Sequence, residues 1–291
     1  MKRERTGSLI WRLIYPLLIF LGVELVIELG ATIVYFAFKM QSGAFENLSE
    51  QGIVDAATAF LTGKALYFTL IRGVVLIPLY LWIMKVDTRL DVYYERDFRY
   101  ADYRKTWLIL LVPAGICAAI GFNGLVSLSG IARFSKAYQA VEKVTYSGNL
   151  FVQIMASAIA APIVEELLFR GLIFKRLRNV TPAVWAMVIS GLVFGIIHGN
   201  LVQFVYAFPI GVILAFIYEI FKTIWAPVIF HVSANFISVM LTNFLPGVEF
   251  NLTVGLLALV SVVTLAILFV ILFVIDNKVK RLSLIHISEP T

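Results

Sequence analysis

Long apolar stretches, separated by short polar segments, run through this chain from one end to the other. A helix of about 20 apolar residues crosses the hydrocarbon core of a bilayer. By that rule, the pattern predicts eight membrane-spanning helices. They cover residues 9–38, 58–84, 107–128, 150–174, 183–198, 201–221, 224–244 and 252–275. The predicted fold class is an all-α polytopic membrane protein with about eight transmembrane helices.

The polar segments differ in their content of Lys and Arg, which is enriched in cytoplasmic loops. Basic residues gather at the start of the chain and after the second, fourth, sixth and eighth stretches. These residues are Lys2, Arg3, Arg5, Arg12, Lys85, Arg89, Arg96, Arg99, Arg104, Lys105, Lys175, Arg176, Arg178, Lys222, Lys278, Lys280 and Arg281. Residues 243–251 contain none, and 129–149 form either an amphipathic helix at the opposite interface or a linker. Both termini are predicted to be cytoplasmic.

Composition agrees with a membrane protein. Of 291 residues, 60% are hydrophobic and 14% charged, against about 25% charged in soluble domains. The first stretch is too long for the core of a signal peptide and is interpreted as a retained span. The single cysteine, Cys117, excludes an internal disulfide and a Cys-based metal site. The net charge of +6 is mostly loop charge. We therefore expect the protein to lie in a lipid bilayer, the cell (plasma) membrane, and to have no nucleic-acid partner.

Three charged groups lie within one apolar stretch, at Glu165, Glu166 and Arg170. Each charge at a bilayer centre costs roughly 2.5–3.5 kcal/mol. Glu166 and Arg170 are four residues apart and can pair on one helix face, whereas Glu165 projects about 100° away. The pattern therefore predicts an ion pair beside a free carboxylate, a candidate general base. The alternative is a salt bridge that serves packing alone. Pro162 cannot donate to the carbonyl of Ala158 and is expected to bend the helix.

Two histidines also lie within spans. His198 follows Phe194 by one turn, and His231 precedes Asn235 by one turn. A lone histidine in a helix is more often a packing residue, but two at membrane depth favour a functional site. With Glu165 they supply a base, imidazoles and an amide, which could activate water and stabilise an oxyanion. Glu165, His198 and His231 could equally hold a zinc ion, although the sequence contains no H-E-x-x-H helix.

Two further features concern helix packing. Gly191 and Gly195 form a G-x-x-x-G pair, which permits close approach of a second helix. Glu24, Glu28 and Arg72 lie deep in the first two spans and are interpreted either as a charge cluster that joins these helices or as residues near the interface.

Three motifs occur in order on successive predicted helices: E-E-x-x-x-R at Glu165, Glu166 and Arg170, F-x-x-x-H ending at His198, and H-x-x-x-N from His231 to Asn235. Over roughly residues 150–245 the chain resembles the CAAX-processing and bacteriocin-processing (CPBP) family of intramembrane proteases, which includes type II CAAX prenyl endopeptidases. The first 130 residues carry no family signal.

The resemblance implies an eight-helix fold with its site in a cavity within the membrane. It implies that Glu165 is the base that activates water together with His198, and that His231 and Asn235 stabilise the tetrahedral oxyanion. Glu166 and Arg170 would support them. The family is often labelled metal-dependent, but a metal-free glutamate mechanism is also argued. Both possibilities stay open at this point: a divalent metal such as zinc, bound by Glu165, His198 and His231, or no cofactor.

The predicted function is therefore an intramembrane endopeptidase acting on peptide, prenylated or membrane-protein substrates. The alternatives are a non-catalytic immunity or scaffold protein and an ion-coupled transporter. Four segments are expected: 1–149 with the first three spans, 150–245 with the catalytic helices, 246–281 with the last span and a basic end, and 282–291. These last ten residues, L-S-L-I-H-I-S-E-P-T, match the translation of a sequencing-library adapter, so the authentic sequence is expected to run to about Arg281.

Overall fold

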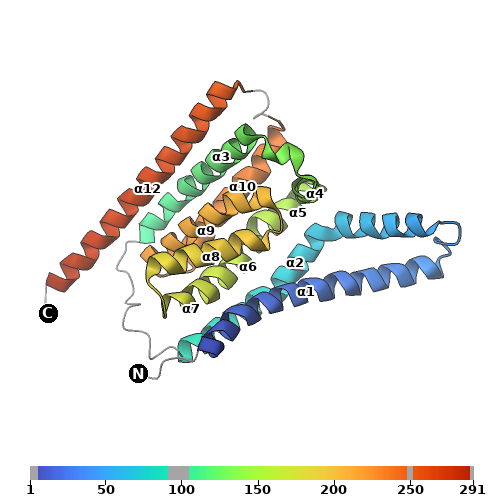
Figure 1. Cartoon of the computed structure of the whole chain (residues 1–291), viewed down its shortest axis with the longest axis horizontal. Helices are drawn as coiled ribbons and strands as arrows, with labels where there is room; N and C mark the ends of the chain where they lie inside the picture. Colours follow the sequence, from blue (N-terminus) through green and yellow to red (C-terminus); the bar gives the residue numbers. More distant parts are fainter. Residues whose placement is uncertain (1–5, 91–104, 248–251, 289–291) are drawn as a thin grey trace.

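The computed structural model describes residues 6–90, 105–247 and 252–288, and these ranges contain helices and turns but no strand (Figure 1). The predicted all-α fold is confirmed. The α-helices are α1 (Thr6–Gln41), α2 (Glu50–Leu90), α3 (Leu111–Ser129), α4 (Lys136–Thr145), α5 (Leu150–Gln153), α6 (Ala161–Glu166), α7 (Lys175–Arg178), α8 (Ala183–Ile197), α9 (Leu201–Phe221), α10 (Trp225–Phe244) and α12 (Val254–Ser288). Two 3-10 helices, η2 (Lys105–Leu110) and η3 (Ile131–Phe134), and two π-helices, η4 (Ile154–Ala160) and η5 (Leu167–Phe174), complete the described elements.

Within the described ranges, seven helices are long and apolar enough to cross a membrane. They are Ser8–Gln41, Glu50–Asp87, Thr106–Ser129, Leu150–Arg178, Leu201–Phe221, Trp225–Phe244 and Val254–Val279. They correspond to seven of the eight predicted spans. The other predicted span, 183–198, is α8, which has 15 residues. At 1.5 Å per residue α8 is about 22 Å long, shorter than the roughly 30 Å hydrocarbon core.

The helix Leu150–Arg178 is one continuous rod in which α5, η4, α6, η5 and α7 follow one another. Its π-helical character is visible where the backbone N–H of Ala161 donates to the carbonyl of Ala156, five residues back. Pro162 follows directly and has no N–H to donate to the carbonyl of Ala158. Wider π turns on both sides of α6 therefore change the direction in which Glu165 and Glu166 point. Such turns occur frequently at functional sites.

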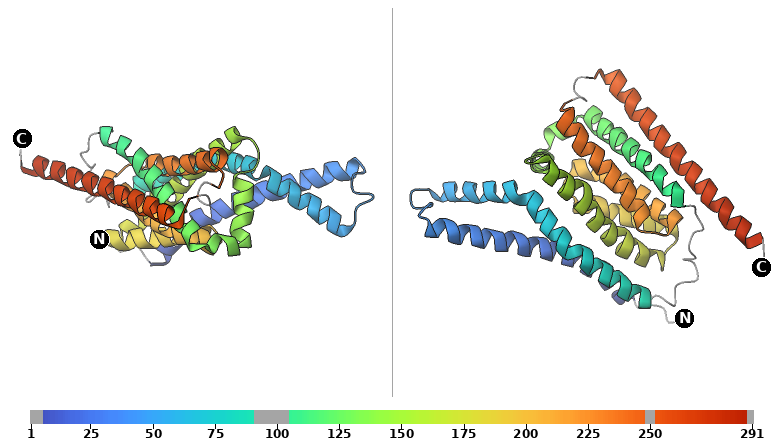
Figure 2. Two further views of the ribbon diagram at one scale, coloured as in Figure 1. Left: turned by 90° about the horizontal axis from the view of Figure 1, so that it is seen from above. Right: turned by 180° about the vertical axis from the view of Figure 1, so that it is seen from behind.

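The helices are arranged as neighbouring layers (Figures 1 and 2). Helix α3 lies between α12 and α10, α8 pairs with α9, and the α1–α2 hairpin lies on the other side of the rod 150–178. One apolar cluster joins α2, the rod, α8 and α9 around Leu168 and Phe174. A second cluster joins α3, α9, α10 and α12 around Phe230. The outward side chains of α1 are apolar and exposed, as expected for contact with lipid.

Glycine allows α8 and α9 to pack closely, as the G-x-x-x-G pair predicts. A Cβ atom on Gly191 would lie 2.9 Å from the backbone nitrogen of Val212, and one on Gly195 would lie 3.2 Å from that of Phe208. Real Cβ atoms essentially never come as close as the first distance, and nine in ten of their contacts are longer than the second. The short helix α8 is therefore fixed against α9 along its length.

Two charged clusters join the N-terminal helices to their neighbours. The predicted contact between the first two spans is present, because Arg72 Nη1 lies 2.5 Å from Glu24 Oε1. The second cluster was not predicted from the sequence. In it, the buried Arg176 of α7 donates to Asp87 of α2 at 2.7 Å and to the hydroxyl of Tyr15 of α1 at 2.6 Å. This cluster ties three helices together at one end of the bundle.

That end carries many of the positive charges. The start of α1, the end of α2, α7 and the end of α12 lie together there, in all the views of Figures 1 and 2. We call it the basic end, after Lys85, Lys175, Arg178 and Lys278. Helix α4 lies at the opposite end, so residues 136–145 are a helix rather than a linker. The cytoplasmic orientation of the termini and the four-segment division of the chain stay predictions, and 289–291 lie outside the described residues.

Candidate active site

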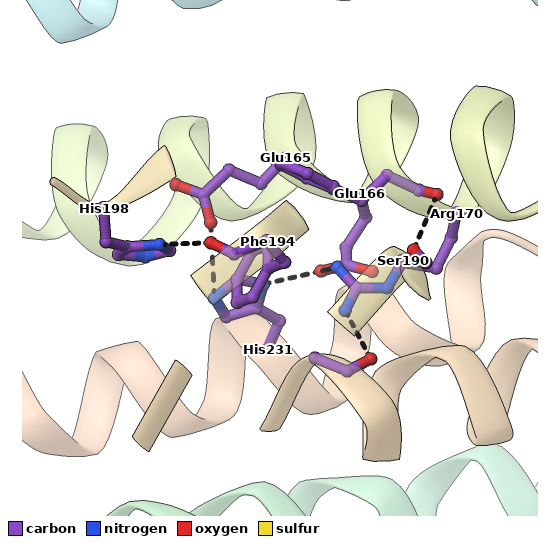
Figure 3. A network of polar contacts seen from close by, with 9 residues as sticks. Glu165, Glu166, Arg170, Ser190, Phe194, His198 and His231 are labelled. Carbon is purple, nitrogen blue, oxygen red and sulfur yellow. Dashed lines mark hydrogen bonds and ion pairs between the residues drawn. The ribbon is translucent and has the colours of Figure 1, made fainter. Parts of the chain in front are cut away.

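The six predicted site residues come from three helices. Glu165 and Glu166 end α6 and Arg170 lies in η5, so residues 165–170 of the rod 150–178 supply three of them. His198 follows the last residue of α8, and His231 and Asn235 lie one turn apart on α10. Figure 3 shows the two glutamates, the arginine and both histidines gathered in one place.

The ion pair of Glu166 and Arg170 lies buried beneath the site. Arg170 Nη1 donates to Glu166 Oε1 at 3.0 Å, as the four-residue spacing predicts, and both side chains are 0% exposed. Arg170 Nη2 also donates to the carbonyl of Gly211 on α9 at 2.8 Å. The guanidinium carbon lies 4.7 Å from the ring centroid of Phe194. Such extensive contacts are what a buried charge needs to offset the loss of its hydration.

Glu166 also holds His231. The Nδ1 atom of His231 lies 2.7 Å from Glu166 Oε1 (Figure 3). Since an ionised carboxylate only accepts hydrogen bonds, Nδ1 carries a proton and donates it. This contact joins residues 65 positions apart in the sequence. It fixes the plane of the imidazole and turns its other nitrogen, Nε2, toward Glu165.

Glu165 occupies a different environment from its neighbour. Its side chain is 20% exposed and lines a cavity of about 440 Å³, whereas Glu166 lies behind the cavity wall. Glu165 Oε2 lies 3.7 Å from His231 Nε2. The division predicted from helical geometry is therefore present, with one carboxylate in the ion pair and the other facing the cavity.

His198 is oriented by the last turn of α8. Its Nδ1 lies 2.7 Å from the carbonyl oxygen of Phe194 and must carry the proton, because a carbonyl can only accept. The ring packs edge-on against Phe194, with centroids 4.8 Å apart. His198 also lines the cavity, where Nε2 is the ring nitrogen left to contact a ligand.

Asn235 completes the set on α10. Its Nδ2 donates to the carbonyl of Ser157 in η4 at 2.9 Å, and its side chain lines the same cavity as Glu165 and His198. One N–H of the amide group is thus used to position the side chain. The second N–H remains as a donor that the amide group can offer to a ligand.

Several partners of the site could not be found from sequence motifs. The carbonyls of Gly211 and Ser157 carry no side-chain signal at all. Phe194 was noted only for its spacing to His198, yet its ring contacts Arg170 and both histidines. Glu24 and Arg72, which form the ion pair between α1 and α2, line the same cavity. Their depth in the predicted spans was the signal that pointed to them.

Zinc binding by Glu165, His198 and His231 stays a prediction. Over the described ranges, no group of three or more His, Cys, Asp or Glu side chains is placed to hold a metal ion. Both nitrogens of His231 face carboxylates, at 2.7 Å and 3.7 Å, and Nδ1 of His198 faces a carbonyl. The Nδ1 atoms of both histidines are therefore taken up by hydrogen bonds, which leaves Nε2 of each histidine and the Glu165 carboxylate as the atoms of the predicted set with lone pairs to offer a metal.

Comparisons with known proteins cover the part of the chain that forms this site. Residues 147–237 match the family described as type II CAAX prenyl endopeptidase Rce1-like. The chain is also 33% identical over 129 residues to the Bacillus subtilis (strain 168) protein named "Putative membrane peptidase YdiL". That match covers 44% of this chain and 50% of the relative, so the chain spans about half the length of the curated relative it matches. No solved structure matches the chain. The three motifs lie within the matched residues, and this part of the chain is similar to the CPBP family of intramembrane proteases.

Proposed function

We propose that this protein is an intramembrane endopeptidase of the cell membrane that hydrolyses peptide bonds with a water molecule activated by Glu165 and His198. The observation that carries the proposal is the placement of Glu165. It faces the cavity 3.7 Å from an imidazole that the buried Glu166 and Arg170 hold in place. A carboxylate with this degree of exposure can reach both water and a bound peptide.

Hydrogen bonding gives the two histidines different roles. His198 donates through Nδ1 to a carbonyl, so its Nε2 is an acceptor that can help orient the attacking water. His231 donates through Nδ1 to Glu166. Nε2 of His231 lies 3.7 Å from Glu165 Oε2, and the proposed mechanism uses an Nε2–H at this position as a hydrogen-bond donor.

The proposed reaction uses these groups in sequence. Glu165 accepts a proton from water as the water oxygen bonds to the scissile carbonyl carbon. The carbonyl oxygen becomes an oxyanion, which Nε2–H of His231 and the amide of Asn235 stabilise. Glu165 then returns the proton to the leaving nitrogen as the carbon–nitrogen bond breaks. The products are a new carboxyl terminus and a new amino terminus, and no atom is left unaccounted for.

The substrate class at this level is a peptide or a segment of a membrane protein, including a lipidated one. Comparative proteomics of cells that carry the wild-type protein or Glu165→Ala tests the proposal, because precursors of the substrates should accumulate in the variant. His198→Ala should give the same set of precursors. Glu50→Gln, at an exposed position at the start of α2, is the matched control and should leave processing unchanged. Identical precursor levels in all four strains would remove the proposal and favour a scaffold or a transporter.

Metal dependence needs its own measurement. The mechanism above predicts that the purified protein retains full activity after chelation and contains no stoichiometric zinc. Loss of activity with a chelator, restored by added zinc, would show that the metal-free mechanism is wrong while leaving peptide hydrolysis intact.

A further inference from the structure

The cavity that contains Glu165 extends toward one end of the bundle only. Beyond Glu166, all eight residues of η5 are buried. Leu168, Phe169, Leu172 and Phe174 are at most 1% exposed and form the centre of the first apolar cluster. Close-packed side chains of this kind leave no passage for water or a peptide. The cavity is therefore closed toward the basic end.

Toward α4, the cavity is lined by polar groups. Ser157 lies about two turns before Glu165 on the rod, Ser238 lies one turn after Asn235 on α10, and Asn123 of α3 donates to the Ser238 hydroxyl at 3.1 Å. This sequence of hydroxyl and amide groups connects the site with the α4 end. Water that is consumed by hydrolysis can follow such a polar wall through an otherwise apolar protein.

Helix α4 forms the rim of this passage. Tyr138, Val141 and Thr145, spaced by three and four residues, place one face of α4 on the cavity. Val141 is 39% exposed and Glu142 next to it is also exposed, so this part of the cavity wall reaches the surface.

Charge indicates which side of the membrane this end faces. The sequence has six Lys or Arg residues between positions 85 and 105 and three between 175 and 178. The end of α2 and α7, which belong to these segments, lie at the basic end. The segment 129–149 at the α4 end carries three, and the segment 243–251 carries none. Cytoplasmic segments are the ones enriched in Lys and Arg. The closed end of the cavity is then cytoplasmic and the α4 end is extracytoplasmic.

We infer that the active site receives its substrate from the extracytoplasmic side, so that the substrates are exported peptides or the extracytoplasmic ends of membrane-anchored proteins. That a substrate enters the cavity rests on the proposed function. The direction in which the cavity opens is independent of catalysis. It excludes polypeptides that stay in the cytoplasm, because their chains meet the packed residues of η5 instead of the cavity.

Thiol labelling tests the direction of the opening without any substrate. In a Cys117→Ser background, single cysteines are introduced by Ser238→Cys inside the cavity, Glu142→Cys at its rim and Lys278→Cys at the basic end. Each variant is treated with a membrane-impermeant maleimide in right-side-out vesicles and in inverted vesicles, with labelling in detergent as the reference. Ser157→Cys replaces Ser238→Cys as the cavity position if the latter does not accumulate in the membrane.

The inference predicts that the cavity and rim cysteines react in right-side-out vesicles and that Lys278→Cys reacts only in inverted vesicles. A cavity cysteine that reacts only in inverted vesicles, in both kinds of vesicle or in neither contradicts it.

The substrate class has a separate readout in the precursors that accumulate with Glu165→Ala. Precursors that are all cytoplasmic proteins would overturn the inference while the proteolytic function stands. Unchanged precursors with the predicted labelling would remove the proposed function and leave the opening in place.

Discussion

At the scale of single residues, two adjacent glutamates are separated by their surroundings. Helical geometry predicts from the sequence that Glu166 pairs with Arg170 and that Glu165 points elsewhere, and the structure contains this division. The contact between Glu166 and His231 could not be predicted, because it joins helices that are distant in the sequence. The hydrogen bonds to the carbonyls of Gly211 and Ser157 could not be predicted either, because every residue has a backbone carbonyl whatever its side chain.

The position of Glu166 leads to a prediction about stability. Glu166→Gln removes the negative charge but keeps the shape, so Arg170 is left buried without its ionic partner. Breaking a buried pair in this way costs about 3–5 kcal/mol. We expect the free energy of unfolding, measured in detergent micelles, to fall by that amount, and hydrolysis to fall with it because His231 loses its anchor.

The control for this prediction is Glu50→Gln, which makes the same chemical change at an exposed position and should leave the unfolding curve unchanged. If Glu166→Gln unfolds like the control, the buried ion pair contributes nothing and the described arrangement is wrong.

At the scale of the helices, length and apolar pattern predicted nearly every element. The spans agree with the helices because a bilayer imposes a simple requirement on length. The π-helical turns η4 and η5 were missed, because they depend on a shift of one residue in the hydrogen bonding. The bounds predicted for α8, 183–198, agree with the structure, but a helix of 15 residues is shorter than the other predicted spans.

Packing between α8 and α9 gives a prediction at this scale. Gly191→Ala places a methyl group within 2.9 Å of the backbone nitrogen of Val212. Because the backbone of a packed helix cannot move aside cheaply, overpacking should cost about 1–3 kcal/mol in the free energy of unfolding. Gly255→Ala is the matched control, since a Cβ there has nothing within 4 Å. Equal unfolding of the two variants contradicts the close approach of these helices.

The ion pair between α1 and α2 can be measured by a double-mutant cycle. Glu24→Ala and Arg72→Ala should each destabilise the protein, and together they should cost less than the sum, because each single change already removes the 2.5 Å contact. We expect a coupling energy of at least about 0.5 kcal/mol. Strictly additive losses would show that the two residues hold their positions independently.

At the scale of the whole molecule, the family match covers residues 147–237, but the cavity does not end there. Phe20, Glu24 and Arg72 of the N-terminal hairpin, together with residues of α3 and α4, form much of its remaining wall. The family match does not include these regions, so motifs could identify the candidate catalytic residues but not the shape of the cavity around them. Side chains that select a substrate are therefore expected in the N-terminal half of the chain.

In the proposed mechanism, Glu165 activates water for hydrolysis of a peptide bond. The decisive experiment incubates the reconstituted protein with an accumulated precursor in ¹⁸O-labelled water and analyses the products by mass spectrometry. We expect one ¹⁸O atom in the new carboxyl terminus made by the wild-type protein and no cleavage by Glu165→Gln. Cleavage by Glu165→Gln at the wild-type rate, or a wild-type product without ¹⁸O, would contradict it.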